Sequence, residues 1–452
     1  SDLAIGGSGS LKVTAAFKNG VTGKDGLLIS GANITVTAKN NGINGKDYCK
    51  IKKAAATVTS GGDAIRSTND SNENLGYITI ADSTLALTAG EDGIQAETSL
   101  KMSGGSCTVI SGGGSGGKLA DDASAKGLKA GKSLTVLSGS YKLDCCDDAV
   151  HSNGSVQISG GEFEISTGDD GVHADENASM SGGTLNVTKG YEGFEGATVD
   201  ISGGTLNIVS SDDGINAAGG NDESGFGARQ DKFGGDSSYY ISISGGVIKI
   251  DASGDGIDSN GDITVSGGEM YISGATNGGN SAIDCDGSVK ITGGTVVAAG
   301  YSGMAQNFGS DSTQGSIMLS SANASTETIT LKDSSGKTLV SYTPAKNYNS
   351  AVISTPDIVK GSTYSASVGG ETTEVTMDSL IYGEGFGMGG DPGAGGMGGM
   401  QPDGDPPEGM SMPEGFTKPD GDPPAKLSGD PPEGMTRPQG DPPQRPEDSG
   451  NA

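Results

Sequence analysis

Apolar and polar residues alternate in short runs along most of the chain. Residues 263–265 read Ile-Thr-Val and residues 269–272 read Glu-Met-Tyr-Ile, with a Ser-Gly-Gly turn between them. Alternation with a period of two predicts half-buried β-strands, and the glycines predict tight turns. No segment shows the 3.6-residue period of an amphipathic helix. The pattern therefore predicts an all-β chain.

The predicted strands recur with a period near 22 residues. An apolar residue follows an acidic turn at Val150, Val172 and Phe194. The same marker in all units lies at Leu27, Ile43, Ile65, Ile94, Leu128, Val150, Val172, Phe194, Ile215, Ile257, Ile283 and Met304. Ser-Gly-Gly begins at Ser103, Ser159, Ser181, Ser202, Ser244 and Ser266. Each unit is thus predicted to hold three short strands.

Such a unit cannot bury its own apolar face, but stacked units can. We predict a right-handed parallel β-helix of about twelve coils, with the usual crossover hand. Two inward columns are expected, one of Val156, Ala178, Val199, Ile241, Ile263 and Val289, and one of Phe163, Leu185, Leu206, Ile248, Met270 and Val296. No proline precedes Pro344, as expected where every coil donates ladder hydrogen bonds.

Three regions are predicted from the changes in pattern. Residues 1–320 form the β-helix, and residues 321–382 form a C-terminal β-rich cap that covers its last edge. Residues 383–452 are rich in Gly, Pro and Asp and repeat Gly-Asp-Pro-Pro, which predicts an extended tail without a core. Polar or glycine-rich insertions at 67–76, 112–126 and 219–240 are expected to leave the coils as loops.

Composition and charge narrow the partners. The 452 residues include 82 glycines and no tryptophan, and the formal net charge is −29. So acidic a chain would repel nucleic acid and anionic membranes, which are themselves polyanions. No apolar stretch is long enough to span a membrane. Because the chain starts at Ser1 rather than at Met, we expect a processed, mature product.

Acidic residues occupy the turn just before the marker in most units. Stacked coils would hold these carboxylates about 4.8 Å apart, where each like pair costs on the order of 3 kcal/mol. A run of hard oxygen ligands suits Ca²⁺. The alternative is that Asp simply favours tight turns and is screened by water. The predicted metal ligands are Glu91, Asp92, Asp147, Asp148, Asp169, Asp170, Glu192, Asp212, Asp213 and Asp255.

A polar strip follows one residue after each marker. It contains Lys129, Asn216 and the chain's two histidines, His151 and His173, one coil apart. Two histidines without a third ligand more often form a solvated ladder than a transition-metal site. We expect the strip and nearby tyrosines to contact sugar. The predicted carbohydrate-binding residues are Lys129, His151, His173, Asn216, Tyr191, Tyr271 and Tyr301.

The Asp-Asp-Gly-Ile/Val turns, the Ser-Gly-Gly strands and the Gly-Asn-Asp sequence at 220–222 resemble a family of secreted carbohydrate-binding domain-containing proteins. The resemblance covers residues 11–382 and is strongest over 147–286. It implies a calcium-binding, right-handed parallel β-helix related in fold to family 9 pectate lyases. It also implies a secreted, cell-surface protein that binds cellulose or acidic sugars. By this resemblance the calcium ligands fall on Asp147, Asp148, Asp169, Asp170, Asp212, Asp213 and Asp255, and Glu192 departs from the usual Asp.

Three functions follow from these features. The first is calcium-dependent binding of plant cell-wall polysaccharide, cellulosic or acidic such as polygalacturonate, without cleavage. The second is a structural subunit that polymerises through its coil ends and proline-rich tail into a calcium-stabilised filament. The third is a pectate-lyase-like enzyme, which needs a basic residue to take a proton from the uronate. Lys126 and Lys129 are the candidates for that base.

Overall fold

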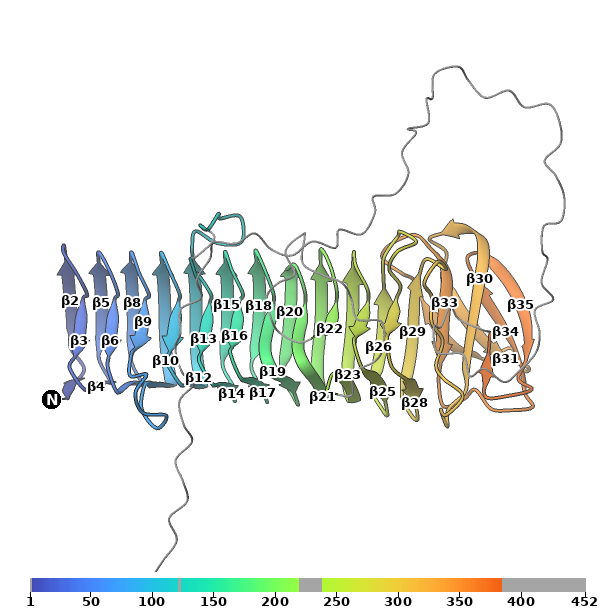
Figure 1. The fold of residues 1–452 in the computed structure, drawn as a ribbon, viewed down its shortest axis with the longest axis horizontal. Coiled ribbons are helices and arrows are strands. Elements are labelled where there is room, and N and C mark those ends of the chain that lie inside the picture. The colour runs from blue at the N-terminus through green and yellow to red at the C-terminus, as the bar shows by residue number, and fades with distance from the viewer. Residues whose placement is uncertain (1, 121–122, 219–237, 384–452) are drawn as a thin grey trace, which may run out of the picture. The chain divides into compact units, whose positions relative to one another are not determined.

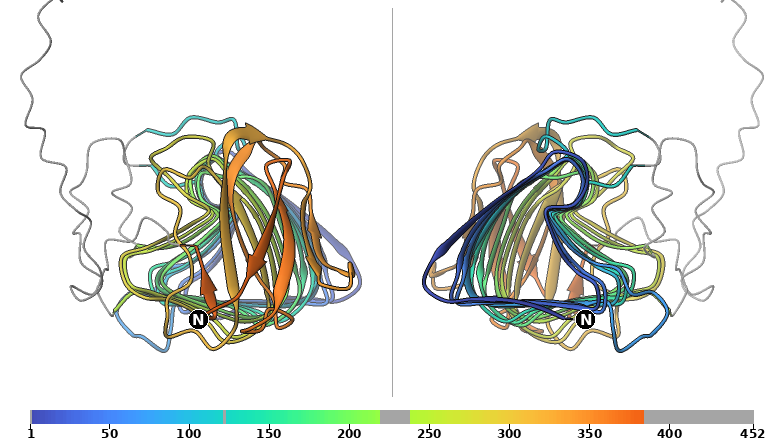
Figure 2. Two further views of the ribbon diagram at one scale, coloured as in Figure 1. Left: turned by 90° about the vertical axis from the view of Figure 1, so that its right-hand side faces the viewer. Right: turned by 90° about the vertical axis from the view of Figure 1, so that its left-hand side faces the viewer.

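The computed structural model describes residues 2–120, 123–218 and 238–383. Every regular element among them is a β-strand, so the all-β prediction is confirmed for this part of the chain. Nearly all pairs within the 32-stranded sheet are parallel. Successive units stack side by side along one axis, and their outlines superpose when viewed end on (Figures 1 and 2). None of the described residues belongs to a helix long and apolar enough to cross a bilayer.

Each unit contributes strands to three parallel ladders. The first ladder holds β3 (Val21–Gly23), β6 (Ile43–Gly45), β9 (Ile65–Ser67), β11 (Ile94–Ala96), β13 (Leu128–Ala130), β16 (Val150–Ser152), the starts of β19 (Val172–Met180) and β21 (Phe194–Ser210), then β22 (Ile215–Ala217), β24 (Ile257–Ser259) and β27 (Ile283–Cys285). The second holds β1 (Leu3–Gly6), β4 (Gly26–Ser30), β7 (Tyr48–Lys52), the first parts of β10 (Tyr77–Ala89) and β12 (Ser99–Ser111), β14 (Ser133–Val136), β17 (Ser155–Ile158), parts of β19 and β21, the first part of β23 (Tyr240–Ala252), β25 (Asp262–Val265) and β28 (Val289–Ile291). The third holds β2 (Ser10–Ala15), β5 (Asn33–Ala38), β8 (Ala55–Ser60), the ends of β10 and β12, β15 (Ser140–Cys145), β18 (Glu162–Thr167), β20 (Thr184–Lys189), the ends of β21 and β23, β26 (Glu269–Ser273) and β29 (Thr295–Gly300).

The ladder register confirms both predicted inward columns. Val156 pairs with Ala178, which pairs with Val199, and Phe163 pairs with Leu185 in the third ladder. The members of both columns are almost fully buried, within one continuous core. The column spacing follows from the 22-residue period, because equivalent residues of neighbouring units pair directly.

The Ser-Gly-Gly turn has a backbone reason. Its second glycine has a positive φ, for example 91° at Gly183. A Cβ there would lie 2.6 Å from the carbonyl oxygen of Gly161 in the preceding unit. A residue with a side chain would therefore meet both the left-handed conformation and the neighbouring coil.

The first marker was wrong by six residues. Val21, and not Leu27, pairs with Ile43 in the first ladder, whereas Leu27 pairs with Cys49 in the second. Asp25 is therefore not in line with the acidic turn residues. The 22-residue interval between Val21 and Ile43 matches the period of the repeat. Val21, however, follows a Lys-Asn-Gly turn and has no acidic residue just before it.

The last parallel edge is covered by antiparallel strands. β33 (Tyr348–Ser354) pairs antiparallel with β29 and with β30 (Ser316–Ser325), which also pairs with β36 (Ile381–Tyr382). A second, four-stranded antiparallel sheet follows the order β32 (Thr338–Tyr342), β31 (Ile329–Asp333), β34 (Thr363–Val368) and β35 (Glu371–Thr376). These strands share a second apolar core. The predicted tail lies outside the described residues, apart from Gly383.

Candidate functional site

The acidic turn residues form a single file that is hydrogen-bonded from coil to coil. Asp63 Oδ1 accepts the backbone N–H of Asp92 at 3.1 Å, and Asp148 Oδ1 accepts that of Asp170 at 3.1 Å. The same bond joins Asp170 to Glu192 at 3.0 Å. One oxygen of each side chain thus satisfies a buried N–H of the next coil, which is a structural reason for an acidic residue at this position.

Basic side chains neutralise the file in the first half of the stack. Lys126 Nζ lies 2.7 Å from Asp147 Oδ1 and 2.6 Å from Asp148 Oδ2. Lys129 Nζ lies 3.5 Å from Asp92 Oδ2. Burial lowers the pKa of Lys126, but the carboxylates of Asp148 and Asp147 outweigh it and raise this pKa above its ordinary value. The Lys126 ammonium is therefore held as a cation.

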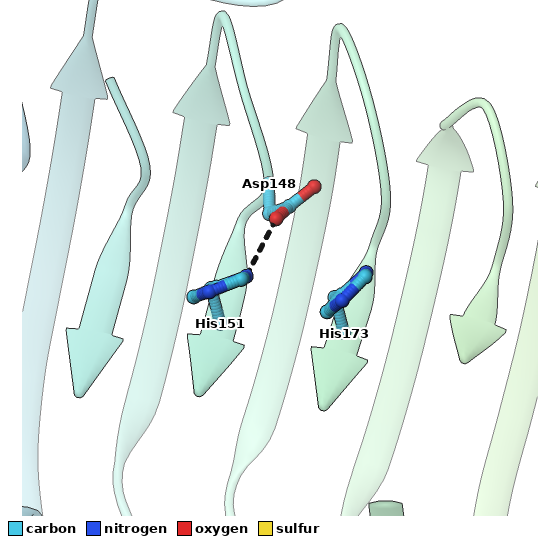
Figure 3. Close-up of side chains that lie close together, drawn as sticks. All are labelled: Asp148, His151 and His173. Atoms are coloured by element: carbon cyan, nitrogen blue, oxygen red, sulfur yellow. Dashed lines mark hydrogen bonds and ion pairs between the residues drawn. The ribbon is translucent and has the colours of Figure 1, made fainter. Parts of the chain in front are cut away.

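The two histidines continue this neutralisation on the next coils. His151 and His173 stack with ring centroids 5.0 Å apart, and His151 Nδ1 lies 2.8 Å from Asp148 Oδ2 (Figure 3). Burial raises the pKa of Asp148, but Lys126 and then His151 hold it below its ordinary value. His173 Nδ1 lies 2.6 Å from Glu195 Oε2 and 3.1 Å from Asp170 Oδ2. Burial lowers the pKa of His173, but its carboxylate contacts raise it above the ordinary value.

The pKa of the Asp170 carboxyl moves in the opposite direction. Burial raises it well above its ordinary value, and the charges of Asp148 and Glu195 add to this, although the bond to His173 opposes them. Burial likewise raises the pKa of Glu192, whose oxygens both accept from Asn216 Nδ2 at 2.9 Å. Negative charge is therefore incompletely compensated around these coils.

The carboxyl groups of the file have raised pKa values farther along the stack. Burial, and then the charge of Asp212, raises the pKa of Asp213 to about 7. Burial and the charge of Asp213 raise the pKa of Asp255 to about 8. The pKa of Asp258 rises well above its ordinary value through burial and the charges of Asp213 and Asp255. Among the ion pairs of the described residues, none involves Asp213, Asp255 or Asp258. We call Asp213, Asp255 and Asp258 the acidic cluster.

The predicted metal ligands thus fall into several surroundings. Asp147, Asp148 and Asp169 offer oxygens within 4.8 Å of one another, although Lys126 already contacts two of them. Asp170 forms a second such group with His173 and Glu195. Asp212 accepts a hydrogen bond from Tyr191, which is the first cause of the raised pKa of that tyrosine. Glu91 stands beside Asp63, and Asp92 bonds to Ser124 and to the Lys126 backbone.

The polar strip is much less accessible than a sugar-binding surface requires. His151, His173 and Asn216 are 6%, 2% and 5% exposed. Lys129 is partly buried and points at Asp92. Five buried side-chain atoms of the described residues have no hydrogen-bond partner, and all lie in this strip: Asn44 Oδ1, Arg66 Nε, Gln95 Oε1, His173 Nε2 and Asn216 Oδ1.

The predicted tyrosines lie apart from one another. Tyr191 and Tyr301 are partly exposed in turns, and Tyr191 lies next to the acidic file. Tyr271 lies in β26 of the third ladder, where its ring is 5.4 Å from that of Tyr342 in β32. The structure therefore brings one predicted tyrosine to an aromatic partner that sequence reasoning did not single out.

A groove of about 940 Å³ runs beside this tyrosine pair. It is lined by residues of five successive third-ladder strands, and Ser341, Tyr342, Thr343 and Ala345 form its far wall. Its polar floor includes Asn186 and Asn207, joined by a hydrogen bond of 2.7 Å between Asn207 Nδ2 and Asn186 Oδ1. Val209, 47% exposed, supplies apolar surface. The sequence did not predict the groove, because Tyr271 and Tyr342 in its lining lie about seventy positions apart.

The parallel ladders, the buried acidic file and the lateral groove define a β-repeat protein in which successive coils line up equivalent side chains. A family model described as carbohydrate-binding domain-containing protein matches residues 1–171, 154–225 and 169–279. These overlapping matches run from residue 1 to residue 279 of 452, more than half of the chain, and the chain belongs to this family. No curated protein and no solved structure matches it.

Proposed function

We propose that this chain is an extracellular, calcium-binding, right-handed parallel β-helix of about twelve coils that binds plant cell-wall polysaccharide without cleaving it. The family match supports binding of carbohydrate as the general role. The groove beside Tyr271 and Tyr342 is the observation that carries the proposal, because its chemistry and its repeat both suit a glycan.

The groove combines the two kinds of contact that sugars need. The Tyr271 and Tyr342 rings offer apolar faces for the C–H face of a pyranose, and Tyr342 is held by neighbouring apolar surface. Asn186, Asn207 and Lys249 present donors and acceptors to hydroxyl groups along the floor. Neighbouring coils are ~4.8 Å apart, close to the length of one sugar unit in an extended β-linked glucan. A linear glucan lying along the stack would therefore meet one coil per sugar.

Calcium is proposed at the acidic cluster. Asp213, Asp255 and Asp258 offer carboxylate oxygens, the ligand type that Ca²⁺ prefers, and burial followed by the charges of neighbouring carboxylates raises their pKa values. Gly254 lets the carboxylates of Asp212 and Asp213 lie close to its backbone. A Cβ at this residue would lie 2.3 Å from Asp213 Oδ1 and 2.4 Å from Asp212 Oδ1. Bound calcium would supply a positive centre beside which a uronate carboxylate is tolerated on this acidic chain.

Binding is favoured over lyase chemistry by the state of Lys126. A general base must be able to lose its proton near the working pH. Asp147 and Asp148 instead keep Lys126 protonated. A calcium-stabilised filament stays a prediction, since the tail proposed to join copies lies outside the described residues.

Affinity electrophoresis and calorimetry with soluble glucans test the groove. Tyr271→Ala and Tyr342→Ala should each weaken binding of a cello-oligosaccharide by up to about tenfold, since an aromatic contact is worth about 0.5–1.5 kcal/mol. Phe17→Ala is a matched control, because this aromatic side chain is 77% exposed and lies outside the groove. Unchanged affinity in both tyrosine variants would place the glycan elsewhere.

A pull-down with polygalacturonate tests the role of calcium separately. Retention should require Ca²⁺ and should be lost on chelation. Asp255→Asn should reduce it, whereas binding of a neutral glucan should be unaffected by the chelator. Retention of polygalacturonate at full strength in chelator would reject calcium bridging and would leave the groove proposal standing.

A further inference from the structure

The two histidines of the chain lie at the centre of a compact group of possible metal ligands. Asp148, His151 and His173 each offer a ligand atom within 4.8 Å of the other two (Figure 3). Asp170, His173 and Glu195 form a second such group, so His173 belongs to both. β16 and the starts of β19 and β21 place His151, His173 and Glu195 side by side, since His151 pairs directly with His173 and His173 with Glu195. The structure thus places Asp148 beside the two histidines as a third possible ligand.

The donor types point to a transition metal and away from calcium. Imidazole nitrogen with carboxylate oxygen suits zinc and its neighbours, whereas Ca²⁺ and Mg²⁺ prefer oxygen alone. The closest carboxylate to each imidazole Nδ1 atom is Asp148 at 2.8 Å from His151 and Glu195 at 2.6 Å from His173. Tetrahedral zinc needs about 3.4 Å between ligand atoms, so Asp148 and His151 would separate by about 0.6 Å. Such a change is within the reach of side-chain rotation.

One ring nitrogen of His173 lacks a hydrogen-bond partner on the side of the ring that faces Asp175. His173 is 2% exposed, and its Nε2 atom has no hydrogen-bond partner. The nearest carboxylate oxygen, Asp175 Oδ1, lies 3.3 Å away, outside hydrogen-bond geometry. Buried polar atoms are nearly always paired with protein, water or an ion. An ion bound through Nδ1 would fix the imidazole ring, and the Asp175 carboxylate would accept a hydrogen bond from Nε2, as carboxylates that support the histidine ligands of zinc do.

The alternative is a closed network of ion pairs, with protonated histidines balancing the acids. Lys126 does balance Asp148 on one side of the group. On the other side, Asp170, Asp175 and Glu195 all face the single imidazole of His173. One proton on that ring leaves negative charge in excess, and a divalent ion would reduce it.

We propose that the chain binds one divalent transition-metal ion of the zinc class at the Nδ1 edges of the stacked imidazoles of His151 and His173, with Asp148 as the carboxylate ligand. Asp170 and Asp175 orient His173 from outside. The site is separate from the acidic cluster at which calcium is proposed, and it does not depend on carbohydrate binding. Its role is to tie two successive coils together.

Calorimetry and metal analysis on the full chain, stripped of metal and free of any purification tag, test the proposal. One Zn²⁺ per chain should bind, and millimolar Ca²⁺ should not displace it. His151→Asn and His173→Asn should each weaken Zn²⁺ binding by at least about 100-fold, the upper range for loss of a supporting partner. Gln95→Ala is the matched control, because Gln95 lies in the same strip outside the cluster.

A measurement on the unaltered chain keeps the test independent of how well the variants fold. The sequence contains only two histidines, so NMR shows two sets of imidazole signals. Both should shift on addition of one equivalent of Zn²⁺, and Co²⁺ should give the visible absorption of a tetrahedral site. No Zn²⁺ binding, displacement by Ca²⁺, or a shift of only one imidazole would overturn the proposal.

Discussion

The acidic cluster predicts an inverted dependence of stability on pH. The pKa of Asp255 rises from 3.8 to about 8 in the folded protein, through burial and the charge of Asp213. An unfolded Asp255 loses its proton near its ordinary pKa, whereas the folded protein keeps it. The unfolded state thus binds fewer protons between these two values, and stability falls as pH rises from about 4 to about 8. Most surface-charged proteins show no such loss in this range.

The size of this effect follows from the difference in pKa. At 1.36 kcal/mol per pKa unit, the rise at Asp255 corresponds to a loss on the order of 5 kcal/mol across the window. Asp213 acts in the same direction with its pKa of about 7, but the two share their mutual repulsion and are not additive. Calcium should restore stability above about pH 7, by about 2.7 kcal/mol when its concentration is one hundred times its dissociation constant.

Asp255→Asn is the perturbation that isolates the charge. The amide keeps the oxygen that accepts the Ser281 backbone N–H. The chain itself uses this chemistry at Asn41, whose Oδ1 accepts the backbone N–H of Asp63 at 3.0 Å. We therefore expect the variant to be more stable than the parent at about pH 8 in chelator, with a flatter pH profile and a smaller response to calcium.

Urea unfolding followed by circular dichroism, at about pH 5 and about pH 8 with chelator or with Ca²⁺, measures the effect. Glu162→Gln, which neutralises an exposed acid in β18, is the control and should leave the profile unchanged. The reasoning is refuted if the parent in chelator is as stable at the higher pH as at the lower one. It is equally refuted if Asp255→Asn lowers stability at the higher pH.

Three further changes test other parts of the structure. Lys126→Met should lower the free energy of unfolding by about 3–5 kcal/mol in chelator, because it leaves Asp147 and Asp148 without their cation; a loss under 1 kcal/mol would argue against that pairing. Phe163→Ala should cost about 3–5 kcal/mol, since this ring is 1% exposed and stacks on Tyr141 at 4.6 Å, and a denaturant midpoint reports it. Gly183→Ala should cost more than about 1–2 kcal/mol from its left-handed backbone alone, and an unchanged melting temperature would contradict this.

Much of the fold could be predicted from the sequence because the repeat constrains it twice. The interval between Val150 and Val172 sets which residues pair, and the alternation around Phe163 sets which side faces the core. The predicted position of the marker was wrong in the unit that lacks the acidic turn. Val21 is not preceded by the acidic turn that marks the other units. Leu27 follows such a turn at Asp25, so the sequence predicted the marker there instead.

The site was less predictable because it depends on which charges meet between coils. The sequence placed Lys126 in the acidic file, but the two carboxylates that it joins come from the next coil, 21 and 22 residues away. The groove depends on Tyr342, which lies in a strand outside the repeat, so no periodicity connects it with Tyr271. Contacts within the repeat could be inferred from spacing, whereas contacts between the repeat and the C-terminal sheet could not.

The repeat also explains how one backbone can hold chemically different sites. Each coil contributes one side chain to the acidic file and one to the polar strip three positions later. A single substitution therefore changes the side chain of one coil and leaves those of the neighbouring coils in place. At His151 the strip residue faces Asp148, and at Asp258 the equivalent residue faces Asp255. The first pair mixes nitrogen and oxygen donors, and the second offers oxygen alone. By the preferences of the ions themselves, the first suits a transition metal and the second suits calcium. Exchanging the two strip residues should therefore exchange the ion preference of the two coils, with the ladders unchanged.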